Sequence, residues 1–250
     1  MRRRILELVR QRPRFGYRRI THLLHREGFR INVKRVYRIW IDEGLRVPRK
    51  VRKKRALGHG GNACHVRRAM SANEVWCWDF IYDRTVYGQS IKWLSIIDEY
   101  TRRCITLDVS RSIRSEDVIN RLSELFLMYG VPKHIRSDNG PEFIAKSIQD
   151  WVARMSIGTL YVKPGSPWEN GYAESFHSRL RDELMNVTEF ESLAHARACG
   201  VTWREDYNDY RPHSSLGGLT PTEFAFRCAA SVPAAPPLQQ HSEPLLLTQT

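Results

Sequence analysis

Three carboxylates stand at places in the sequence where metal-dependent chemistry could occur. Asp79 lies inside an aromatic segment, Asp138 ends a short apolar segment, and Glu174 follows a stretch rich in glycine and proline. Three carboxylates brought together repel one another unless cations hold them, and such hard oxygen ligands suit Mg²⁺ or Mn²⁺. Two ions can activate an attacking oxygen and stabilise a leaving one, so the predicted chemistry is phosphoryl transfer. By itself this pattern is weak, because the chain has 27 acidic residues.

The carboxylates need elements that bring them to one place, and the residue pattern from Glu74 onward predicts such elements. Segments rich in Trp, Ile, Val and Thr between turn residues predict strands, and apolar residues at helical spacing predict helices. Strands are expected over 75–81, 91–97, 103–109, 134–137 and 159–162, and helices over 115–129, from Pro141, over 172–187 and over 192–208. This order indicates an α/β layered domain, in which ligands bind where strand ends converge at one edge of the sheet.

Positive charge is concentrated at the front of the chain. Residues 1–70 contain 22 Lys and Arg against 4 Asp and Glu, whereas the other 180 residues contain 18 basic and 23 acidic groups. A basic module joined to a mildly acidic body predicts binding to a polyanion, and nucleic acid is favoured over an anionic lipid surface or a plainly solvated face. Five cysteines without a CxxC pair argue against a disulfide framework.

Residues 1–45 are predicted to form a small all-α domain of the helix-turn-helix kind. Gly28 ends one helix, Asn32 can cap the next, and Gly44 closes it. The outer face of this second helix carries the basic residues Lys34, Arg35 and Arg38. A basic second helix is typical of the helix that meets DNA in such motifs, although many small helical domains are simply basic.

Residues 46–70 lack helical or strand periodicity and are dense in positive charge. They are expected to form a flexible linker that lies along phosphates. The most basic run of this linker contains Arg52, Lys53, Lys54 and Arg55. Residues 231–250, which contain four prolines, are expected to form a disordered tail.

Several motifs occur together around the three carboxylates. TrpCysTrpAspPhe contains Asp79, ArgSerAspAsnGlyProGluPhe contains Asp138, and ProTrpGluAsnGlyTyrAlaGluSerPhe contains Glu174. Thirty-five residues separate Asp138 from Glu174, and Arg181 follows seven residues after Glu174. Two further motifs occupy residues 97–103 and 207–224. With these motifs the chain resembles the second-frame transposases of insertion elements, which are DDE recombinases with a core similar to that of retroviral integrases.

The resemblance implies a catalytic core over residues 71–230, which ends in a C-terminal helical segment. The implied fold of this core is ribonuclease H-like, with a mixed five-stranded sheet and helices. The resemblance implies that Asp79, Asp138 and Glu174 are catalytic and bind two Mg²⁺ or Mn²⁺ ions, and that Arg181 contacts DNA. The implied activity is that of a transposase, which cuts DNA at the ends of an insertion element and transfers the freed 3′-hydroxyl into target DNA.

The resemblance also implies partners. These are double-stranded DNA at the element ends and the target, further copies of the chain on paired ends, and the upstream-frame helix-turn-helix protein, to which family members are often fused by frameshifting. The implied location is the bacterial cytoplasm, in association with the nucleoid. No zinc is expected, because His22 and His25 have no CxxC pair near them.

Two other functions remain open from the sequence. One is a non-catalytic DNA-binding inhibitor of transposition or an inactive remnant, and the other is a nuclease of the same fold that does not join strands. The intact triad and Arg181 favour an enzyme over a remnant. Cleavage without joining cannot be separated from transposition on the sequence.

Other residues near the triad have simpler interpretations. Asp98 is expected to fix the turn after the second strand, and Asp83 to lie beyond the first strand. Along an uninterrupted α-helix, Glu174 and Arg181 fall within about 20° of one face. The acid and a cation are therefore expected on the same side of that helix.

Overall fold

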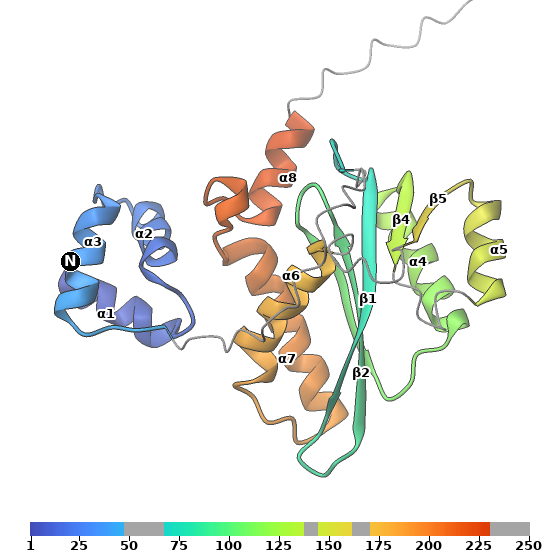
Figure 1. The fold of residues 1–250 in the computed structure, drawn as a ribbon, viewed down its shortest axis with the longest axis horizontal. Helices are drawn as coiled ribbons and strands as arrows, with labels where there is room; N and C mark the ends of the chain where they lie inside the picture. The colour runs from blue at the N-terminus through green and yellow to red at the C-terminus, as the bar shows by residue number, and fades with distance from the viewer. Residues whose placement is uncertain (48–67, 138–144, 162–170, 231–250) are drawn as a thin grey trace, which may run out of the picture.

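The computed structural model describes residues 1–47, 68–137, 145–161 and 171–230. These residues form two bodies, a group of three helices at the N-terminus and a larger body built around one β-sheet (Figure 1). The predicted tail and the basic run of the predicted linker, Arg52, Lys53, Lys54 and Arg55, lie outside the described residues. Among the described residues, no helix is long and apolar enough to cross a membrane.

Three short helices make up the N-terminal body: α1 (Arg2–Gln11), α2 (Tyr17–Arg26) and α3 (Val33–Asp42). The side chain of Asn32 accepts a hydrogen bond from the backbone N–H of Lys34 at 2.8 Å and so caps α3. The chain leaves α2 and α3 through Gly28 (φ +85°) and Gly44 (φ +62°), as the sequence predicts. The helices share a core of their own, made of Ile5, Leu8, Phe15, Ile20, Leu23, Leu24, Ile31, Val36 and Trp40.

Five strands form the sheet of the larger body, in the order β3-β2-β1-β4-β5. Their bounds are β1 Val75–Arg84, β2 Ser90–Asp98, β3 Cys104–Ser110, β4 His134–Ser137 and β5 Gly158–Tyr161. β2 is antiparallel to both β1 and β3, whereas β1, β4 and β5 are parallel to one another. This is the mixed five-stranded sheet that the resemblance implies.

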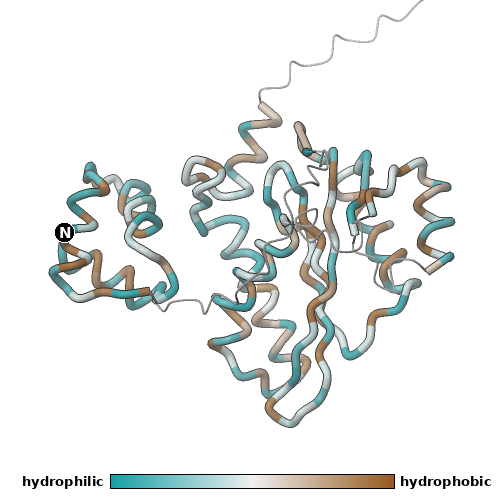
Figure 2. Tube along the Cα trace, in the orientation of Figure 1, coloured by the Kyte–Doolittle hydropathy of each residue, from teal (hydrophilic) through white to brown (hydrophobic). Residues whose placement is uncertain are grey.

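Helices cover both faces of the sheet. α4 (Ser115–Tyr129) and α5 (Lys146–Arg154) lie on one face, and α6 (Gly171–Leu180) and α7 (Leu193–Glu205) lie on the other (Figure 1). The central strands are therefore strongly apolar, as the brown stretches of β1 and β2 in Figure 2 show. Successive residues of β1 alternate between the layers: Trp76 and Trp78 pack with α4 and α5, whereas Cys77 and Ile81 pack with α6 and α7.

The start of α5 differs from the prediction. α5 begins at Lys146, with Ala145 in a non-helical conformation as its N-cap, and therefore later than the predicted start at Pro141. Pro141 itself lies outside the described residues. Proline is favoured in the first turn of a helix, but it is equally common in turns, and this ambiguity explains the wrong boundary.

The two helices predicted at 172–187 and 192–208 also differ in their last turns. They begin as α6 and α7, but each continues into a π-helical turn, Arg181–Met185 after α6 and Asp206–Tyr210 after α7. A π-turn holds more residues than an α-turn, so angles calculated for an α-helix no longer hold beyond Leu180. A 3₁₀ turn (Ser214–Leu216) and α8 (Pro221–Ala230) complete the described chain.

Arginines of the N-terminal body pair with acids of the C-terminal helical segment. Arg12 pairs with Asp206. Arg14 and Asp182 are 3.6 Å apart, Arg19 and Glu183 are 3.1 Å apart, and Arg26 and Glu223 are 2.6 Å apart. Part of the positive charge at the front of the chain is therefore neutralised inside the molecule, and the charge distribution of the sequence gives no sign of this pairing.

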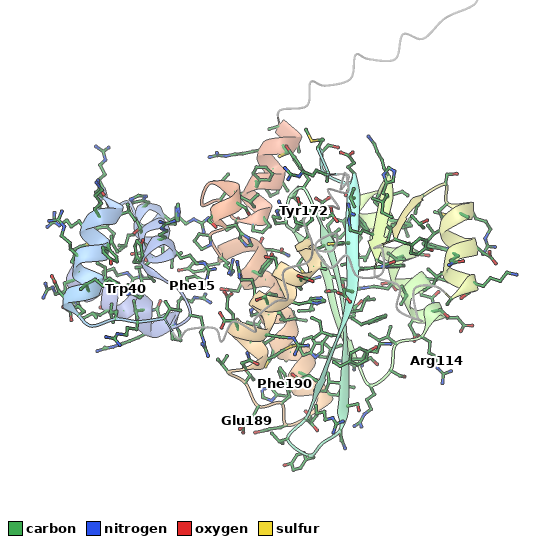
Figure 3. All side chains as sticks on the ribbon, viewed as in Figure 1. Phe15, Trp40, Arg114, Tyr172, Glu189 and Phe190 are labelled. Atoms are coloured by element: carbon green, nitrogen blue, oxygen red, sulfur yellow. The ribbon has the colours of Figure 1, made fainter. Side chains whose placement is uncertain are left out.

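Glu183 is the most buried of these acids. Its carboxylate accepts two hydrogen bonds from Arg211, at 2.8 and 2.7 Å, and one from Arg19 at 3.1 Å. Burial raises the pKa of Glu183, but the hydrogen bonds and charge of Arg211, together with the charge of Arg19, outweigh burial and leave the pKa below its ordinary value. Figure 3 shows Phe15 among the N-terminal helices, and the guanidinium groups of Arg19 and Arg211 lie 5.1 and 6.0 Å from its ring centre.

Replacing Glu183 with Gln should lower the free energy of unfolding by about 3 kcal/mol. The largely buried guanidinium groups of Arg19 and Arg211 would then lose the carboxylate that neutralises them. Urea unfolding at pH 7 measures the change in the free energy of unfolding. The matched control is Glu124→Gln, which removes an exposed carboxylate paired with Arg121 at 2.8 Å and should cost about 0–1 kcal/mol. Equal unfolding midpoints for the two variants would contradict the role given to Glu183.

His213 gives the stability a predictable pH dependence. Burial, followed by the charge of Arg211, lowers the pKa of His213 from 6.5 to about 3. Below pH 6.5 the imidazole of His213 binds a proton in the unfolded chain but stays neutral in the folded chain until the pH approaches 3. The free energy of unfolding should therefore fall as the pH drops from 6.5 toward 3, by up to about 1.4 kcal/mol per pH unit for this histidine.

A series of urea unfolding curves between pH 7.5 and 4.5 tests this dependence, with His213→Gln as the comparison. The variant should lose less stability than the parent over the acidic half of the series. Parallel pH profiles for the two proteins would show that His213 does not carry the effect.

Candidate active site

Asp79 lies in the middle of β1 and faces the layer formed by α6 and α7. It shares this side of the strand with Cys77 and Ile81, which pack in that layer. Across the antiparallel pair with β2, Asp79 stands opposite Ser95. Its side chain is 18% exposed, and its Oδ1 accepts the backbone N–H of Phe80 at 2.7 Å. Asp79 and Ser95 are thus polar residues on a sheet face that is otherwise largely apolar.

His177 and Ser95 hold this part of β1 in place. The hydroxyl of Ser95 donates to the carbonyl oxygen of Asp79 at 3.1 Å, and Nε2 of His177 lies 2.9 Å from the same hydroxyl oxygen. Nδ1 of His177 lies 3.6 Å from Oδ2 of Asp79. Burial, followed by the charge of Arg181, lowers the pKa of His177 to about 4, so the imidazole is neutral at pH 7. No motif in the sequence singles out His177, although its position three residues after Glu174 puts both on one face of a helix.

Glu174 lies in the first turn of α6, where a carboxylate complements the helix dipole. The helix is held against the sheet by the buried residues Ala173, Phe176 and Leu180. Because His177 on the same helix reaches Asp79, α6 brings Glu174 to the side of the sheet on which Asp79 lies. Within the described part of the chain, however, no three His, Cys, Asp or Glu side chains gather closely enough to hold a metal ion.

Asp138, the third predicted carboxylate, lies outside the described residues. The strand that leads to it is described: β4 ends at Ser137 and lies beside β1, with Cys77 opposite Arg136. Arg136 makes a buried ion pair, since its Nε lies 2.6 Å from Oε1 of Glu99, and the two side chains are 6% and 0% exposed. This pair ties β4 to the turn after β2.

Asp98 has the structural role that the sequence predicts. Its carboxylate accepts the backbone N–H groups of Asn73 at 2.7 Å, Tyr100 at 2.9 Å and Thr101 at 2.8 Å. The sequence predicts that Asp83 lies beyond the first strand, but β1 runs to Arg84, so Asp83 lies inside it. The prediction failed because β1 and β2 pair through to their hairpin, as far as Arg84 opposite Ser90.

Arg181 is exposed and begins the π-turn after α6. Its charge contributes to the lowered pKa of His177. The helical angle predicted between Glu174 and Arg181 assumed an unbroken α-helix, which ends at Leu180.

The basic residues predicted to contact DNA from the N-terminal body, Lys34, Arg35 and Arg38, are all exposed on α3. Tyr37 and Ile41, on the same helix, are also 47% and 57% exposed. The histidines considered for zinc have other surroundings: Nε2 of His25 lies 2.7 Å from the carbonyl oxygen of Ile31, and the ring of His22 lies against Gly218.

Comparison with known families assigns both bodies. Residues 1–55 match the family described as an HTH-like domain, and residues 69–167 and 155–221 match two families that are each described as an integrase core domain.

Two relatives illustrate the similarity at the level of sequence. The chain is 37% identical over 239 residues to a Burkholderia multivorans protein described as the insertion element IS407 uncharacterized 31.7 kDa protein, and the match covers 93% of this chain and 83% of that protein. It is 28% identical over 233 residues to the putative transposase InsK for insertion sequence element IS150 of Escherichia coli K12, and this match covers 90% and 82%.

Solved structures show the same fold. A chain of the simian T-cell lymphotropic virus intasome, solved with PP2A regulatory subunit B56 gamma, has a TM-score of 0.55 at 16% identity, over 98% of this chain and 80% of that chain. The HTLV-2 integrase catalytic core domain, solved in complex with magnesium in a trimeric form, has a TM-score of 0.50 at 16% identity, over 63% of this chain and 99% of that chain. The core therefore has the expected ribonuclease H-like fold. Together with the sequence relatives, this shows that the chain belongs to the insertion-sequence transposases with an integrase core, the DDE-type polynucleotidyl transferases that cleave DNA and transfer the cut strand.

Proposed function

We propose that Asp79, Asp138 and Glu174 are the catalytic carboxylates of this transposase. The observation that carries the proposal is that α6, which bears Glu174, packs on the side of β1 that bears Asp79, with His177 Nδ1 3.6 Å from Asp79 Oδ2. The chain enters residue 138 from β4, the strand beside β1, which supports adding Asp138 to this pair.

The same three residues are proposed to hold two Mg²⁺ ions, or Mn²⁺ in their place. Carboxylate oxygens are the donors that these cations prefer. The integrase core of HTLV-2 was solved with magnesium. When bound, the ions would lower the charge barrier to attack on a phosphodiester. We propose no zinc site.

The proposed reaction has two displacements at phosphorus. In the first, water attacks the phosphodiester at an element end, a new P–O bond forms, and the bond to the 3′ oxygen breaks and leaves a free 3′-hydroxyl. In the second, this hydroxyl attacks a target phosphodiester and displaces another 3′ oxygen. Ser95 and His177 keep β1 and α6 in register, so that the carboxylates of Asp79 and Glu174 keep their positions during both steps.

The basic elements are proposed to hold the duplex. Residues 1–45 would act as the DNA-binding domain through Lys34, Arg35 and Arg38, and residues 46–70 as a linker whose Arg52, Lys53, Lys54 and Arg55 follow the phosphates. Arg181 would contact a phosphate beside the carboxylates. Residues 71–230 would be the catalytic core, and residues 231–250 a tail outside it.

We also propose that several copies of the chain act together on paired element ends, since the HTLV-2 core was solved as a trimer and the simian viral relative in an intasome. The helix-turn-helix protein of an upstream frame is a further proposed partner. The proposed setting is the nucleoid of a bacterium.

The Asp138→Asn variant should lose strand joining with Mg²⁺ by about a hundredfold or more, because a neutral amide binds the cation far more weakly than a carboxylate. Asp79→Asn should lose joining equally. The affinity for duplex DNA should stay the same, since basic groups hold the duplex. The assay measures the joining of short duplexes that carry the element ends to a plasmid target.

Asp83→Asn is the matched control, because Asp83 lies on the same strand as Asp79, closer to its end. It should join ends at the parental rate. Native joining by Asp138→Asn would refute the triad. Cleavage without joining by the parent would identify a nuclease, and binding without cleavage would identify an inhibitor or a remnant.

The double variant Arg35→Gln/Arg38→Gln should bind duplex DNA more weakly and with a shallower salt dependence. Each lost phosphate contact lowers the slope of log K against log salt by about 0.9, so the pair should lower it by about 1.8. Fluorescence anisotropy with a labelled element end, at several KCl concentrations, gives this slope. The control Arg3→Gln/Arg10→Gln removes the same charge from exposed positions on α1, and should leave the slope near that of the parent. Equal salt slopes for the two double variants would exclude α3 as the DNA-contacting helix.

A further inference from the structure

A cavity of about 410 Å³ lies on the flank of α6 that faces away from Asp79. Its walls come from α6, the turn after β2, the segment after the second π-turn, and α2 of the N-terminal body. Five arginines line it, namely Arg19, Arg68, Arg102, Arg179 and Arg211, and none of its described lining residues is acidic. We refer to it as the arginine pocket.

The two flanks of α6 are distinct. His177, which faces Asp79, and Arg179, which faces the pocket, are two residues apart and therefore about 200° apart around the helix. Ser175 and Tyr172 share the pocket side with Arg179. The arginine pocket is thus separate from the proposed carboxylate site and from Arg181.

The positive charge of the arginine pocket is only partly balanced. Arg19 and Arg211 share the single carboxylate of Glu183. Arg102 donates to the carbonyl oxygen of Glu99 and lies over the ring of Tyr172, with 3.9 Å to the ring centre. Arg179 and Arg68 make no hydrogen bond or ion pair with any described residue. Among the described residues, five guanidinium groups therefore face one buried carboxylate.

The arginines of the pocket lower the pKa values of nearby basic groups through charge repulsion. Burial, followed by the charge of Arg211, lowers the pKa of Arg19 to about 10, and Arg179 adds to this effect. The same three arginines help to lower the pKa of the buried His213. An anion between them would relieve this repulsion. Arrays of guanidinium groups favour phosphate, whose oxygens accept paired N–H bonds.

We propose that the arginine pocket binds a phosphate group of the DNA backbone. The exposed residues Arg68, Ser175, Ser214 and Ser215 form its open side, where a duplex can approach. Arg19 belongs to the N-terminal body, whereas the other arginines of the pocket belong to the larger body. A DNA strand bound in the pocket would therefore also join the two bodies. The inference rests on the proposed function, since it requires DNA beside the carboxylates.

The test compares Arg179→Gln with Arg154→Gln in the full chain. Arg154 is exposed on α5, on the opposite face of the sheet, so the control removes the same charge far from the pocket. We expect Arg179→Gln to weaken duplex binding about tenfold at ~0.15 M salt and to lower the log–log salt slope by about 0.9, whereas Arg154→Gln should match the parent. Anisotropy without divalent cations isolates binding from cleavage.

A second variant covers the case in which Arg179→Gln does not fold. Ser175→Asp places an acid at the exposed mouth of the pocket and should weaken binding at least as much, whereas Ser147→Asp, at an exposed position in the first turn of α5, should not. Parental binding by a folded Arg179→Gln or Ser175→Asp protein would overturn the inference. The Asp138→Asn and Arg35→Gln/Arg38→Gln results do not depend on the pocket, so they show separately whether the proposed function has failed.

Free phosphate is the other possible source of the anion. Thermal unfolding in inorganic phosphate and in chloride at equal ionic strength distinguishes free phosphate from a phosphate of the DNA backbone. If phosphate stabilises the parent but not Arg179→Gln, while both bind DNA with the same salt slope, the pocket takes free phosphate and the assignment to DNA is wrong.

Discussion

The packing of α6 on the face of β1 and β2 is the contact on which the rest of this structure depends. Phe176 and Leu180 bury the helix against Cys77, Ile81 and Trp93. This apolar contact fixes where the two polar flanks of the helix point. One flank brings His177 to Asp79 and Ser95, and the other presents Ser175 and Arg179 to the arginine pocket. A single helix therefore organises both the candidate active site and the candidate phosphate site.

Buried polar groups around the sheet edge have structural roles in this arrangement. Asp98 gathers three backbone N–H groups, and Glu99 pairs with Arg136. Asn208 donates to the carbonyl of Cys104 and accepts from its N–H, both at 2.8 Å, and so continues the edge of β3 as another strand would. These groups lie inside the motifs that carry the family resemblance. Much of the motif sequence thus serves to hold strands and turns in place, because a buried polar group without a partner is costly.

Charge is divided between two tasks in the N-terminal body. Arg12, Arg14, Arg19 and Arg26 face acids of the C-terminal helical segment, whereas Lys34, Arg35 and Arg38 remain on an exposed face of α3. The body is therefore held against the core by its own positive charge while its outer helix stays accessible. Gly218 contributes to this contact, since a Cβ atom there would come within 2.2 Å of the His22 ring.

The sequence by itself predicted the elements and the family. Segments rich in Trp, Ile, Val and Thr between turn residues predicted the strands, and helical spacing with Asn32, Gly28 and Gly44 predicted α2 and α3. The motifs around Asp79 and Glu174 indicated the integrase core. These features are local, because each depends on residues a few positions apart along the chain. Only the tertiary structure decided the pairing of Arg19 and Arg211 with Glu183, the contact of His177 with Asp79, and the pocket beside Arg179. Arg19 and Glu183 are 164 residues apart in sequence, and no local pattern encodes which of many arginines meets a given acid, since that choice depends on how the helices pack.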